Sequence, residues 1–414
     1  MACRKQTTDI LDKGCDSFMP LGRILIIVEN LPVPNDRRVW LEARTLRDVG
    51  YDVSIISITG KNAKKFHEVL DGISIYRYPA PPLTKGTFSF IYEFTYCWIS
   101  TFIISTIIAF VKGFDIIHAC NPPETFWLIA ILHKLFGKKF VFDHHDLSPE
   151  MYYSRFGRRG LAYKVLLLLE RLTFITADVV ITTNESHRRV AIDRGKFPPE
   201  RIFIVRSGPD HNTLCPCPPD ERLKQGRPYM VSYLGLLNPQ DGVDLFLHVA
   251  SYIVHELKRQ DIQFVIMGTG DAGDDLQKLS HKLGMDAYVN FTGWVELNAI
   301  KTYLSTSDVC VDTIPKTPYS NVSTMNKVLE YMAAARPVVT FDLVESRISA
   351  ENSAVYANPN DVVDFANKVT SLLDDEEQRV NMGKEGRKRI ETMLSWEHSK
   401  PSLLAAYEVV NKHK

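Results

Sequence analysis

Short apolar segments alternate with longer amphipathic segments along most of the chain, and this alternation predicts its secondary structure. The apolar segments of the first half are RILIIVEN, YDVSIISI, FDIIHA, KKFVFDHH and ADVVITTN. A second series follows with YMVSYLG, QFVIMG, YVNFTG, DVCVDTI and RPVVTFD. Buried strands separated by helical segments are typical of βαβ units, so we expect an α/β protein with two parallel sheets covered by helices.

The alternation is interrupted at residues 206–228, where RSGPD precedes the proline-rich segment CPCPPDERLKQGRP. This break indicates a linker between two doubly wound, Rossmann-like domains in tandem. We predict a loose tail at 1–22, a first domain at 23–205, a second domain at 206–390 and a final helical segment at 391–414.

Composition narrows the class of protein. The chain has 414 residues, of which 45% are hydrophobic and 24% charged, and this excludes a disordered or disulfide-scaffold protein. Its formal net charge is zero, so we expect no nucleic-acid partner. Residues 1–210 contain 28 basic and 22 acidic side chains, whereas residues 211–414 contain 21 and 27. A basic half (+6) joined to an acidic half (−6) suggests two domains with different partners.

The cysteines and the N-terminal segment predict a cytoplasmic protein. The chain has seven cysteines and no CxxC pair, a pattern typical of reduced thiols in a cytosolic protein. The first 22 residues are polar and lack the apolar segment of a secretory signal.

One segment argues against the prediction of a soluble protein. Residues 94–111, FTYCWISTFIISTIIAFV, form 18 consecutive positions without a charge, which is the lower bound for a membrane span. Five of them carry hydroxyl groups from Ser or Thr, and a predicted strand follows directly. We expect a buried or interfacial helix that covers the sheet. A true span and contact with the bilayer surface are the alternatives.

Two short patterns resemble ligand sites but favour simpler interpretations. Gly268, Gly270 and Gly273 form a GxGxxG between a strand and a helix, yet the acidic residue expected about 20 positions later in a dinucleotide site is missing. A tight turn whose N–H groups line a nucleotide site is the preferred interpretation. Asp143 to Asp146 lie consecutively at a strand end, where neighbouring side chains point to opposite faces. We therefore expect no metal there, and one histidine facing the space between the domains.

Residues 320–342, SNVSTMNKVLEYMAAARPVVTFD, carry the clearest anion-binding pattern. Ser323 or Thr324 is expected to cap a helix whose N-terminus presents free N–H groups. Lys327 adds a positive charge, and Glu330 lies one turn later, where it could accept hydrogen bonds from a ribose. The alternative is an ordinary capped helix with a surface Lys–Glu pair.

Several segments together resemble the glycosyltransferases of family 4, which have the GT-B fold. They are EYMAAARPVV, FTGWV, the strand followed by a GTG turn, YLG…DGVD and the terminal segment beginning SWE. FDHHDLSPEMYY and IIHACNPPE resemble the bacterial branch that builds surface polysaccharides, and the similarity extends over residues 23–410. The resemblance implies two domains facing across a cleft, and transfer of a sugar from a nucleotide sugar with retention of configuration. It also implies that neither a divalent metal nor another cofactor is needed.

The resemblance assigns roles to individual residues. Glu330 matches the second glutamate of an E-x7-E motif, which holds the ribose, while Val322 stands at the first. Leu236 and Asp241 stand where the family has a phosphate-binding arginine and lysine. Other cations are therefore expected to replace the arginine and lysine, because binding a diphosphate without charge compensation would cost free energy. The full set implied is His145 and Glu330 for catalysis, with donor contacts from Gly235, Arg206, Gly268, Gly270, Trp294, Val295, Asn326, Lys327 and Arg347.

The resemblance also indicates the partners. A hexose or N-acetylhexosamine would come from a UDP-sugar, with a GDP-sugar as the alternative, and go to a polysaccharide or lipid-linked acceptor in surface glycan synthesis. Acceptor or membrane contacts are expected from the first domain, with peripheral binding to the inner face of the cytoplasmic membrane. The residues are Asp36, Arg37, Arg155, Arg158 and Arg159. An ordinary solvated basic surface remains an alternative, as does a catalytically silent subunit that stabilises a partner transferase.

Overall fold

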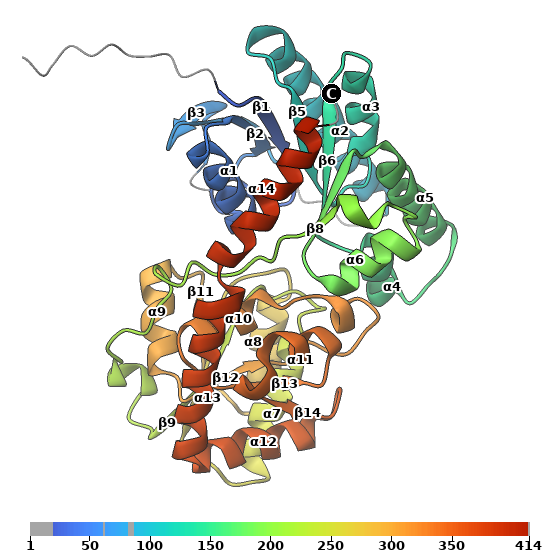
Figure 1. The fold of residues 1–414 in the computed structure, drawn as a ribbon. Helices are drawn as coiled ribbons and strands as arrows, with labels where there is room; N and C mark the ends of the chain where they lie inside the picture. Colours follow the sequence, from blue (N-terminus) through green and yellow to red (C-terminus); the bar gives the residue numbers. More distant parts are fainter. Residues whose placement is uncertain (1–19, 61–62, 82–86, 413–414) are drawn as a thin grey trace, which may run out of the picture.

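The structure is a computed structural model that describes residues 20–60, 63–81 and 87–412. Most of the predicted tail at 1–22 lies outside these residues. Figure 1 shows two α/β domains joined through residues 205–228, with the C-terminal helix passing back from the second domain to the first.

The first domain is built on an eight-stranded sheet with the order β3-β4-β2-β1-β5-β6-β7-β8. All neighbours pair in parallel except β3 and β4, which form an antiparallel pair. The strands are β1 (Arg23–Ile27), β2 (Asp52–Ile58), β3 (His67–Leu70), β4 (Ile73–Tyr78), β5 (Ile116–Cys120), β6 (Lys139–His144), β7 (Val179–Thr182) and β8 (Ile202–Ile204). The helices are α1 (Arg37–Asp48), α2 (Thr87–Val111), α3 (Phe126–Lys134), α4 (Ser148–Phe156), α5 (Leu161–Thr176) and α6 (Glu185–Asp193).

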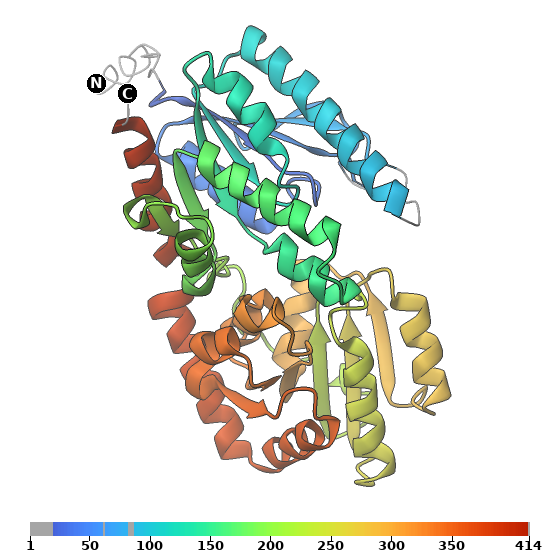
Figure 2. The same cartoon turned by 90° about the vertical axis from the view of Figure 1, so that its right-hand side faces the viewer.

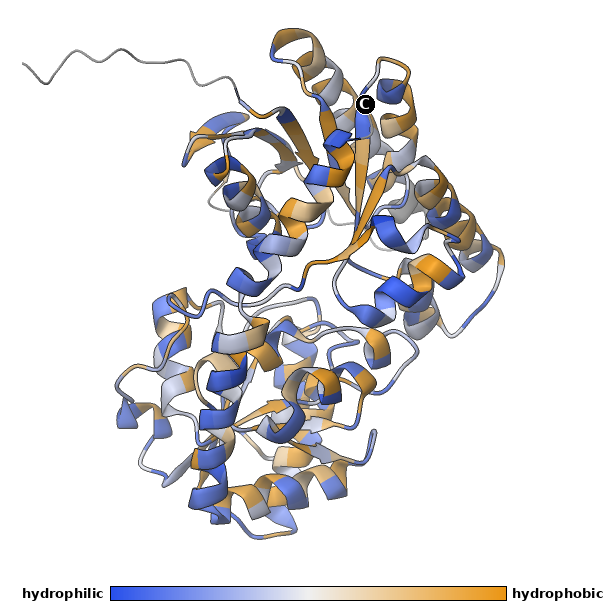
Figure 3. Ribbon diagram, viewed as in Figure 1, coloured by the Kyte–Doolittle hydropathy of each residue, from blue (hydrophilic) through white to orange (hydrophobic). Residues whose placement is uncertain are grey.

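Strand alternation explains why this sheet is apolar on both faces. In β1, Ile24 and Ile26 belong to one core, which faces α1, whereas Leu25 and Ile27 belong to another, which faces α2 and α3. Successive side chains of a strand point to opposite faces, so a strand covered on both sides reads as a continuous apolar run. Figure 3 colours these strands hydrophobic along most of their length.

The second domain has a six-stranded, wholly parallel sheet with the order β11-β10-β9-β12-β13-β14. Its strands are β9 (Tyr229–Leu234), β10 (Ile262–Met267), β11 (Val289–Gly293), β12 (Val309–Asp312), β13 (Val338–Phe341) and β14 (Ala354–Ala357). Its helices are α7 (Val243–His255), α8 (Gly273–Lys282), α9 (Leu297–Thr306), α10 (Asn326–Ala333), α11 (Val344–Ala350), α12 (Val362–Asp374) and α13 (Glu376–Arg389). The prediction of two doubly wound parallel-sheet domains is confirmed.

The last helix, α14 (Trp396–Lys412), belongs by packing to the first domain. Trp396, Leu403 and Tyr407 are buried in the core beside β1 and α1, and Trp396 donates from Nε1 to Thr45 Oγ1 at 3.0 Å. The chain therefore crosses between the domains twice. The two crossings touch, because a Cβ on Gly208 would lie 2.0 Å from the carbonyl oxygen of Leu394.

Helix α2 is buried along one stripe only, and that stripe covers the sheet, as expected. Cys97, Thr101, Ile104, Ser105 and Ile108 face the sheet and are buried. The other side is exposed because no element of the described structure covers it. Among the described residues one helical segment, Tyr92–Val111, is long and apolar enough to cross a membrane, and 28% of its most apolar window is buried.

Candidate active site

Two glycine-containing loops pack backbone against backbone where β9 and β10 end. Gly268 has φ +140°, and a Cβ there would lie 1.8 Å from the carbonyl oxygen of Gly235. A Cβ on Gly270 would lie 2.6 Å from the backbone of Leu237, whose N–H donates to the Thr269 carbonyl at 3.1 Å. Glycine is needed at both positions because the other loop occupies the space of a side chain. The close approach that this motif provides is between two protein loops, and it fixes the position of Gly235.

The N-terminus of α10 lies uncapped beside this loop. Met325 is the capping residue and makes no side-chain bond to the helix, so the prediction of Ser323 or Thr324 as the cap is wrong. Ser323 Oγ instead donates to the Tyr319 carbonyl at 2.8 Å, and Thr324 Oγ1 accepts from Asn184 Nδ2 of the first domain at 3.0 Å. Asn326, the first helical residue, is exposed. The N–H groups of Asn326 and Lys327 have no hydrogen-bond partner in the described part of the chain and can bind an anion.

Lys327 places a buried ammonium group over Gly235. Its Nζ donates to Tyr233 Oη at 3.1 Å and lies 3.4 Å from Asp312 Oδ1. A Cβ on Gly235 would be 3.0 Å from Lys327 Cε. Burial alone would lower the pKa of Lys327, but Tyr233 and Asp312 outweigh this effect and raise it. Lys327 is therefore a permanent positive charge, part of which Asp312 already balances.

Glu330 projects from the same helix and meets the first domain. Its side chain is 16% exposed and forms an ion pair with Arg37, whose side chain is 56% exposed. Burial raises the pKa of the Glu330 carboxyl, and Arg37 offsets part of that effect. Asp36, predicted to contact the acceptor or membrane, accepts a hydrogen bond from the Val39 N–H at 3.1 Å and caps α1. The cap holds Arg37 at the start of that helix, where it faces the second domain.

His145 lies on the opposite side of the same region, within a buried charge network. Its Nε2 lies 2.5 Å from Asp143 Oδ2 and 2.7 Å from Arg38 Nε. Arg38 also donates from Nη2 to Asp143 Oδ1 at 2.8 Å. Although burial alone would raise it, Arg38 and His145 hold the pKa of Asp143 well below its usual range. Because Arg37 and Arg38 are consecutive, α1 connects Glu330 directly to His145.

The neighbouring His144 points to the other face, as strand alternation predicts. It lies between Phe142 and Phe174, with Nε2 3.5 Å from Glu170 Oε1. His145 is 14% exposed at its side chain, while His144 is fully buried. His144 is thus a core histidine, and His145 is the one that faces the charge network near the second domain.

Four side chains near His145 could by spacing hold a metal ion. Potential ligand atoms of Glu42, Cys120, Asp143 and His145 lie within 4.8 Å of one another. The guanidinium group of Arg38 lies among them, 3.2 Å from Glu42 Oε1 and 2.8 Å from Asp143 Oδ1. Arg38 is hydrogen-bonded to Asp143 and in ion-pair distance of Glu42, so its charge already compensates the negative charge that a metal would neutralise. The donor set therefore fits an ion-pair network better than a metal centre.

Several contacts between the domains were absent from the sequence predictions. Asp146 Oδ1 accepts from Tyr319 Oη at 2.6 Å, next to His145. Ser186 Oγ donates to Glu345 Oε1 at 2.6 Å, and Arg206 Nη1 lies 3.9 Å from Glu345 Oε2. Burial lowers the pKa of Arg206, and its Nη1 has no hydrogen-bond partner within the described part of the chain. Arg206 thus lies at the domain interface with an unused donor.

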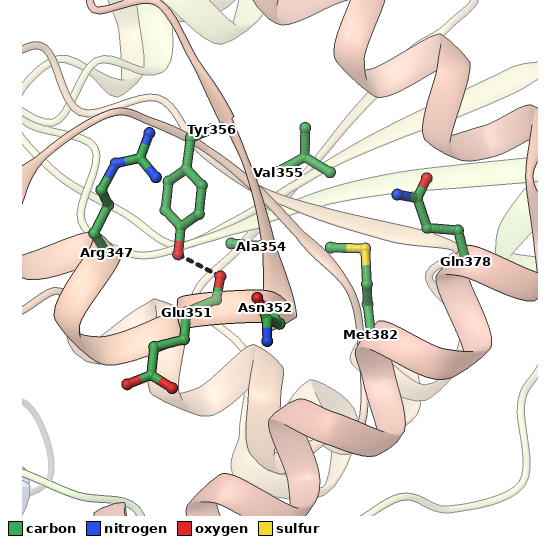
Figure 4. A pocket seen from close by; sticks show the side chains of 8 residues that line it. All are labelled: Arg347, Glu351, Asn352, Ala354, Val355, Tyr356, Gln378 and Met382. Atoms are coloured by element: carbon green, nitrogen blue, oxygen red, sulfur yellow. Dashed lines mark hydrogen bonds between the residues drawn. The ribbon is translucent and has the colours of Figure 1, made fainter.

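Arg347, predicted as a donor contact, is paired within the second domain. Its Nη2 donates to Asp342 Oδ2 at 2.7 Å, and its guanidinium lies 4.4 Å from the Tyr356 ring. Figure 4 shows both side chains in a surface pocket of about 650 Å³ beside the edge strand β14. Gly268 follows β10, near the other edge of the same sheet. The Asp342 pair and the Tyr356 ring hold Arg347 at this edge.

The remaining predicted residues lie at two places. Trp294 is exposed after β11, and Val295 packs against the core near α10. Arg155 lies exposed in the last turn of α4, and Arg158 and Arg159 lie exposed between α4 and α5, with Arg159 4.7 Å from the Tyr153 ring. The arginines therefore belong to the outer surface of the first domain and not to the Glu330 region.

Comparison with solved structures defines the class of fold. Sucrose-phosphate synthase from Thermosynechococcus elongatus matches with a TM-score of 0.76 and 17% identity, covering 95% of this chain and 100% of that one. Anabaena HepE in complex with UDP-glucose matches with a TM-score of 0.71 and 14% identity, covering 94% and 99%. The architecture of this protein is thus the GT-B fold of glycosyltransferases.

Family models and sequence relatives agree with this fold. Residues 36–208 match the model of the glycosyl transferase 4-like domain, and residues 228–375 match that of glycosyl transferases group 1. An uncharacterized glycosyltransferase of Methanocaldococcus jannaschii is 24% identical over 323 residues, 73% of this chain and 76% of that protein. The GPI3 subunit of phosphatidylinositol N-acetylglucosaminyltransferase of Saccharomyces cerevisiae is 24% identical over 300 residues, 71% and 60%. The chain belongs to family 4 of the GT-B glycosyltransferases.

Proposed function

We propose that this glycosyltransferase moves a hexose or N-acetylhexosamine from a nucleotide sugar, with a UDP-sugar favoured, to a lipid-linked or polysaccharide acceptor with retention of configuration. The observation that carries the proposal is the convergence of four groups: the uncapped N-terminus of α10, Lys327, Glu330 and, across the domain interface, His145. The solved relative HepE, which binds UDP-glucose, supports a UDP-sugar as the donor.

In this proposal the donor lies along the start of α10. The carboxylate of Glu330 accepts hydrogen bonds from the ribose hydroxyls, and the free N–H groups of α10 receive the diphosphate. Trp294 and Val295 lie beside the base. The transferring sugar then points toward the first domain, where His145 contacts it and orients the acceptor.

Charge compensation of the diphosphate requires more than Lys327, because Asp312 balances part of its charge. Arg37, which pairs with Glu330, and Arg206, which pairs with Glu345 beside Thr324, are the further cations that we propose. Arg37 is half exposed and held only by Glu330 within the described contacts, and Arg206 Nη1 has no hydrogen-bond partner there. We propose that donor binding moves Arg37 from Glu330 to the diphosphate. This arrangement replaces the arginine and lysine lost at Leu236 and Asp241.

The reaction follows from these positions. The bond between the sugar anomeric carbon and the diphosphate oxygen breaks, and the acceptor hydroxyl forms the new bond on the same face. The proton of that hydroxyl passes to an oxygen of the departing diphosphate. The α10 N-terminus, Lys327 and the arginines stabilise the negative charge that develops on the leaving group, so no divalent metal or other cofactor is proposed.

Names of relatives support the proposed acceptor. The yeast relative is by its name a phosphatidylinositol N-acetylglucosaminyltransferase, so its acceptor is a lipid. By analogy we propose a lipid-linked acceptor in surface glycan synthesis, used by a cytoplasmic enzyme at the inner face of the membrane.

One observation favours a second candidate function, a catalytically silent subunit. Glu330 is already paired with Arg37, and Lys327 with Asp312, so both proposed donor ligands have protein partners. A silent subunit would keep these pairs, bind no nucleotide tightly and form a stable complex with an active transferase.

The two functions are distinguished by thermal-shift titration of the protein with UDP, GDP, ADP and their common sugars. The enzyme is expected to be stabilised by one nucleotide, and Glu330→Ala to lose that stabilisation. Glu351→Ala is the matched control, since Glu351 also pairs with an arginine, Arg389, and neither residue belongs to α10. Absence of a shift with every nucleotide would contradict the enzyme and favour the silent subunit.

A further inference from the structure

Three helices of the first domain present large apolar side chains to the outside. Helices α2, α3 and α5 lie side by side over one face of the first sheet, as Figure 2 shows. The most exposed side chains are Phe110 (87%), Val111 (83%), Phe136 (79%) and Leu161 (79%). We name this surface the apolar face, and its residues are Ile99, Ile103, Ile107, Phe110, Val111, Leu128, Ile131, Leu132, Leu135, Phe136, Leu161, Val165, Leu168 and Ile175.

The apolar face gathers 14 exposed large hydrophobic residues on or next to three helices of the first domain. Scattered exposed leucines are normal, but contiguous apolar patches beyond a few hundred Å² mark interaction sites. The face also has no exposed carboxylate. Residues 94–111 and 126–134 contain no acidic residue, and in residues 161–176 Glu170 is buried and bonded to Arg194. A partner of this face therefore needs no positive charge.

Exposed cations lie at one end of the face. Arg155, Arg158, Arg159 and Lys164 are exposed where α4 leads into α5. Tyrosines accompany them, with the Arg159 guanidinium 4.7 Å from the Tyr153 ring and 5.9 Å from the Tyr163 ring. Arginine, lysine and tyrosine beside an apolar surface are typical of the interface between a bilayer and water.

Helix α2 contacts the sheet too closely to leave it for the bilayer interior. Cys97, Ile104 and Ile108 belong to the core between this helix and the strands, and the hydroxyl of Thr101 lies 3.5 Å from Tyr78 Oη. Withdrawing α2 into a membrane would expose that core to water. A partner must therefore bind the outer side of α2 while α2 stays on the sheet.

We propose that the apolar face docks on the surface of an anionic lipid bilayer, with α2, α3 and α5 lying in the plane of the membrane. In a two-fold symmetric dimer, the apolar face of one copy would contact the same face of the other copy. The cations at its end would then find no carboxylate to pair with. A protein partner would need hydrogen-bonding groups spaced across the contact, and the outer positions of α2 and α3 supply few. A bilayer needs only apolar side chains beneath a basic rim.

The proposal deepens the proposed function and rests on it for the identity of the acceptor. Helix α4 follows β6, so Arg155 and its neighbours lie beyond the strand end that carries His145. With the apolar face on the membrane, a lipid-linked acceptor reaches His145 by moving along the surface and keeps its lipid chain in the bilayer.

Vesicle co-sedimentation of the full chain tests this surface. We expect sedimentation with vesicles of mixed phosphatidylcholine and phosphatidylglycerol, and weaker binding to phosphatidylcholine alone. The double variant Phe110→Glu/Phe136→Glu is expected to bind at least about tenfold more weakly, because two inserted aromatic side chains become charged. The matched control is Val380→Glu/Met393→Glu, which changes two exposed apolar residues of the second domain and should bind as the wild type does.

The outcomes are separable from those of the nucleotide test. No vesicle binding by the wild type, or equal binding by the face variant and its control, would overturn the docking surface even if UDP still stabilises the protein. Loss of a dimer in the Phe110→Glu/Phe136→Glu variant, seen by light scattering, would identify a second copy as the partner and also overturn it. Vesicle binding by a protein that no nucleotide stabilises in the thermal-shift titration would support the docking surface and refute the proposed enzymatic activity. Quenching of Trp98 and Trp127 fluorescence by brominated lipid, stronger in wild type than in Trp98→Phe, checks the same contact without altering the apolar face.

Discussion

Replacement of Arg37 by alanine tests how the enzyme compensates the negative charge of the donor diphosphate. In the structure Arg37 pairs with Glu330, and its side chain is 56% exposed. A pair this exposed contributes at most about 1 kcal/mol. A hydrogen bond from an arginine to a phosphate contributes about 1.5–3 kcal/mol. Exchanging the first interaction for the second leaves a net gain of about 0.5–2 kcal/mol, so Arg37→Ala should raise the Kd for UDP roughly 2- to 30-fold.

Isothermal titration calorimetry with UDP measures this change directly. Arg44→Ala is the matched control, because Arg44 lies on the same helix, is half exposed and pairs with Asp71. Arg37→Lys should retain part of the affinity, since lysine keeps the charge but loses the planar donor geometry. If Arg37→Ala binds UDP as tightly as the wild type or more tightly, Arg37 merely obstructs Glu330, and the proposed exchange is refuted.

Three further predictions concern the glycine loops and the buried carboxyl groups. Gly268→Ala should lower the free energy of unfolding measured by urea denaturation by roughly 2–4 kcal/mol, because the new Cβ would lie 1.8 Å from the Gly235 carbonyl oxygen. Gly273→Ala is the control and should be tolerated, because a Cβ there has no atom within 4 Å. Asp143→Asn should lower the free energy of unfolding by about 3–5 kcal/mol, because Arg38 loses the buried carboxylate to which it is hydrogen-bonded. The folded pKa of Asp143 is depressed, so its stabilising contribution is full above the unfolded pKa of about 3.9 and is lost as the pH falls toward the folded value. The urea midpoint of the variant should therefore depend less on acid pH than that of the wild type. Burial raises the pKa of Glu330, so its carboxylate becomes protonated at a higher pH than that of an ordinary glutamate when the solution is acidified. UDP affinity measured by calorimetric titration should therefore begin to weaken at that higher pH, and Glu330→Gln should remove this pH dependence.

Much of the fold was predictable because its strands are covered on both faces. YMVSYL and IQFVIM are continuous apolar runs, and they became β9 and β10. Strands β3, β4, β8 and β14, which sequence reasoning omitted, lack this signal. Strand β4, ISIYRY, lies inside the sheet between β3 and β2, but polar residues interrupt its apolar ones. The edge strand β3, HEVL, has two exposed positions, and β14, AVYA, has only four residues between polar segments. Short edge strands are held by a single neighbour, so their sequences are weakly constrained.

The site was predictable where its residues share one local element. Lys327 and Glu330 lie on one helix, and their placement beside the Gly235 loop follows from the strand–loop–helix pattern. The Arg37–Glu330 and Asn184–Thr324 pairs join residues far apart in the chain, and no local pattern reports such contacts. A usable signal did exist for the buried network. Arg38 and Glu42 are charged residues one turn apart among the apolar positions of α1, which is unusual unless both are paired.

The contribution of α14 to the first domain has a consequence for synthesis of the protein. Trp396, Leu403 and Tyr407 complete the core beside β1, and Tyr407 Oη lies 2.8 Å from His118 Nδ1. The ribosome makes β1 before the second domain and this helix after it, so the core beside β1 cannot close until the whole second domain has been synthesised. Until then its apolar surface beside β1 stays accessible to chaperones and proteases. The first domain to be synthesised is therefore the last to finish folding.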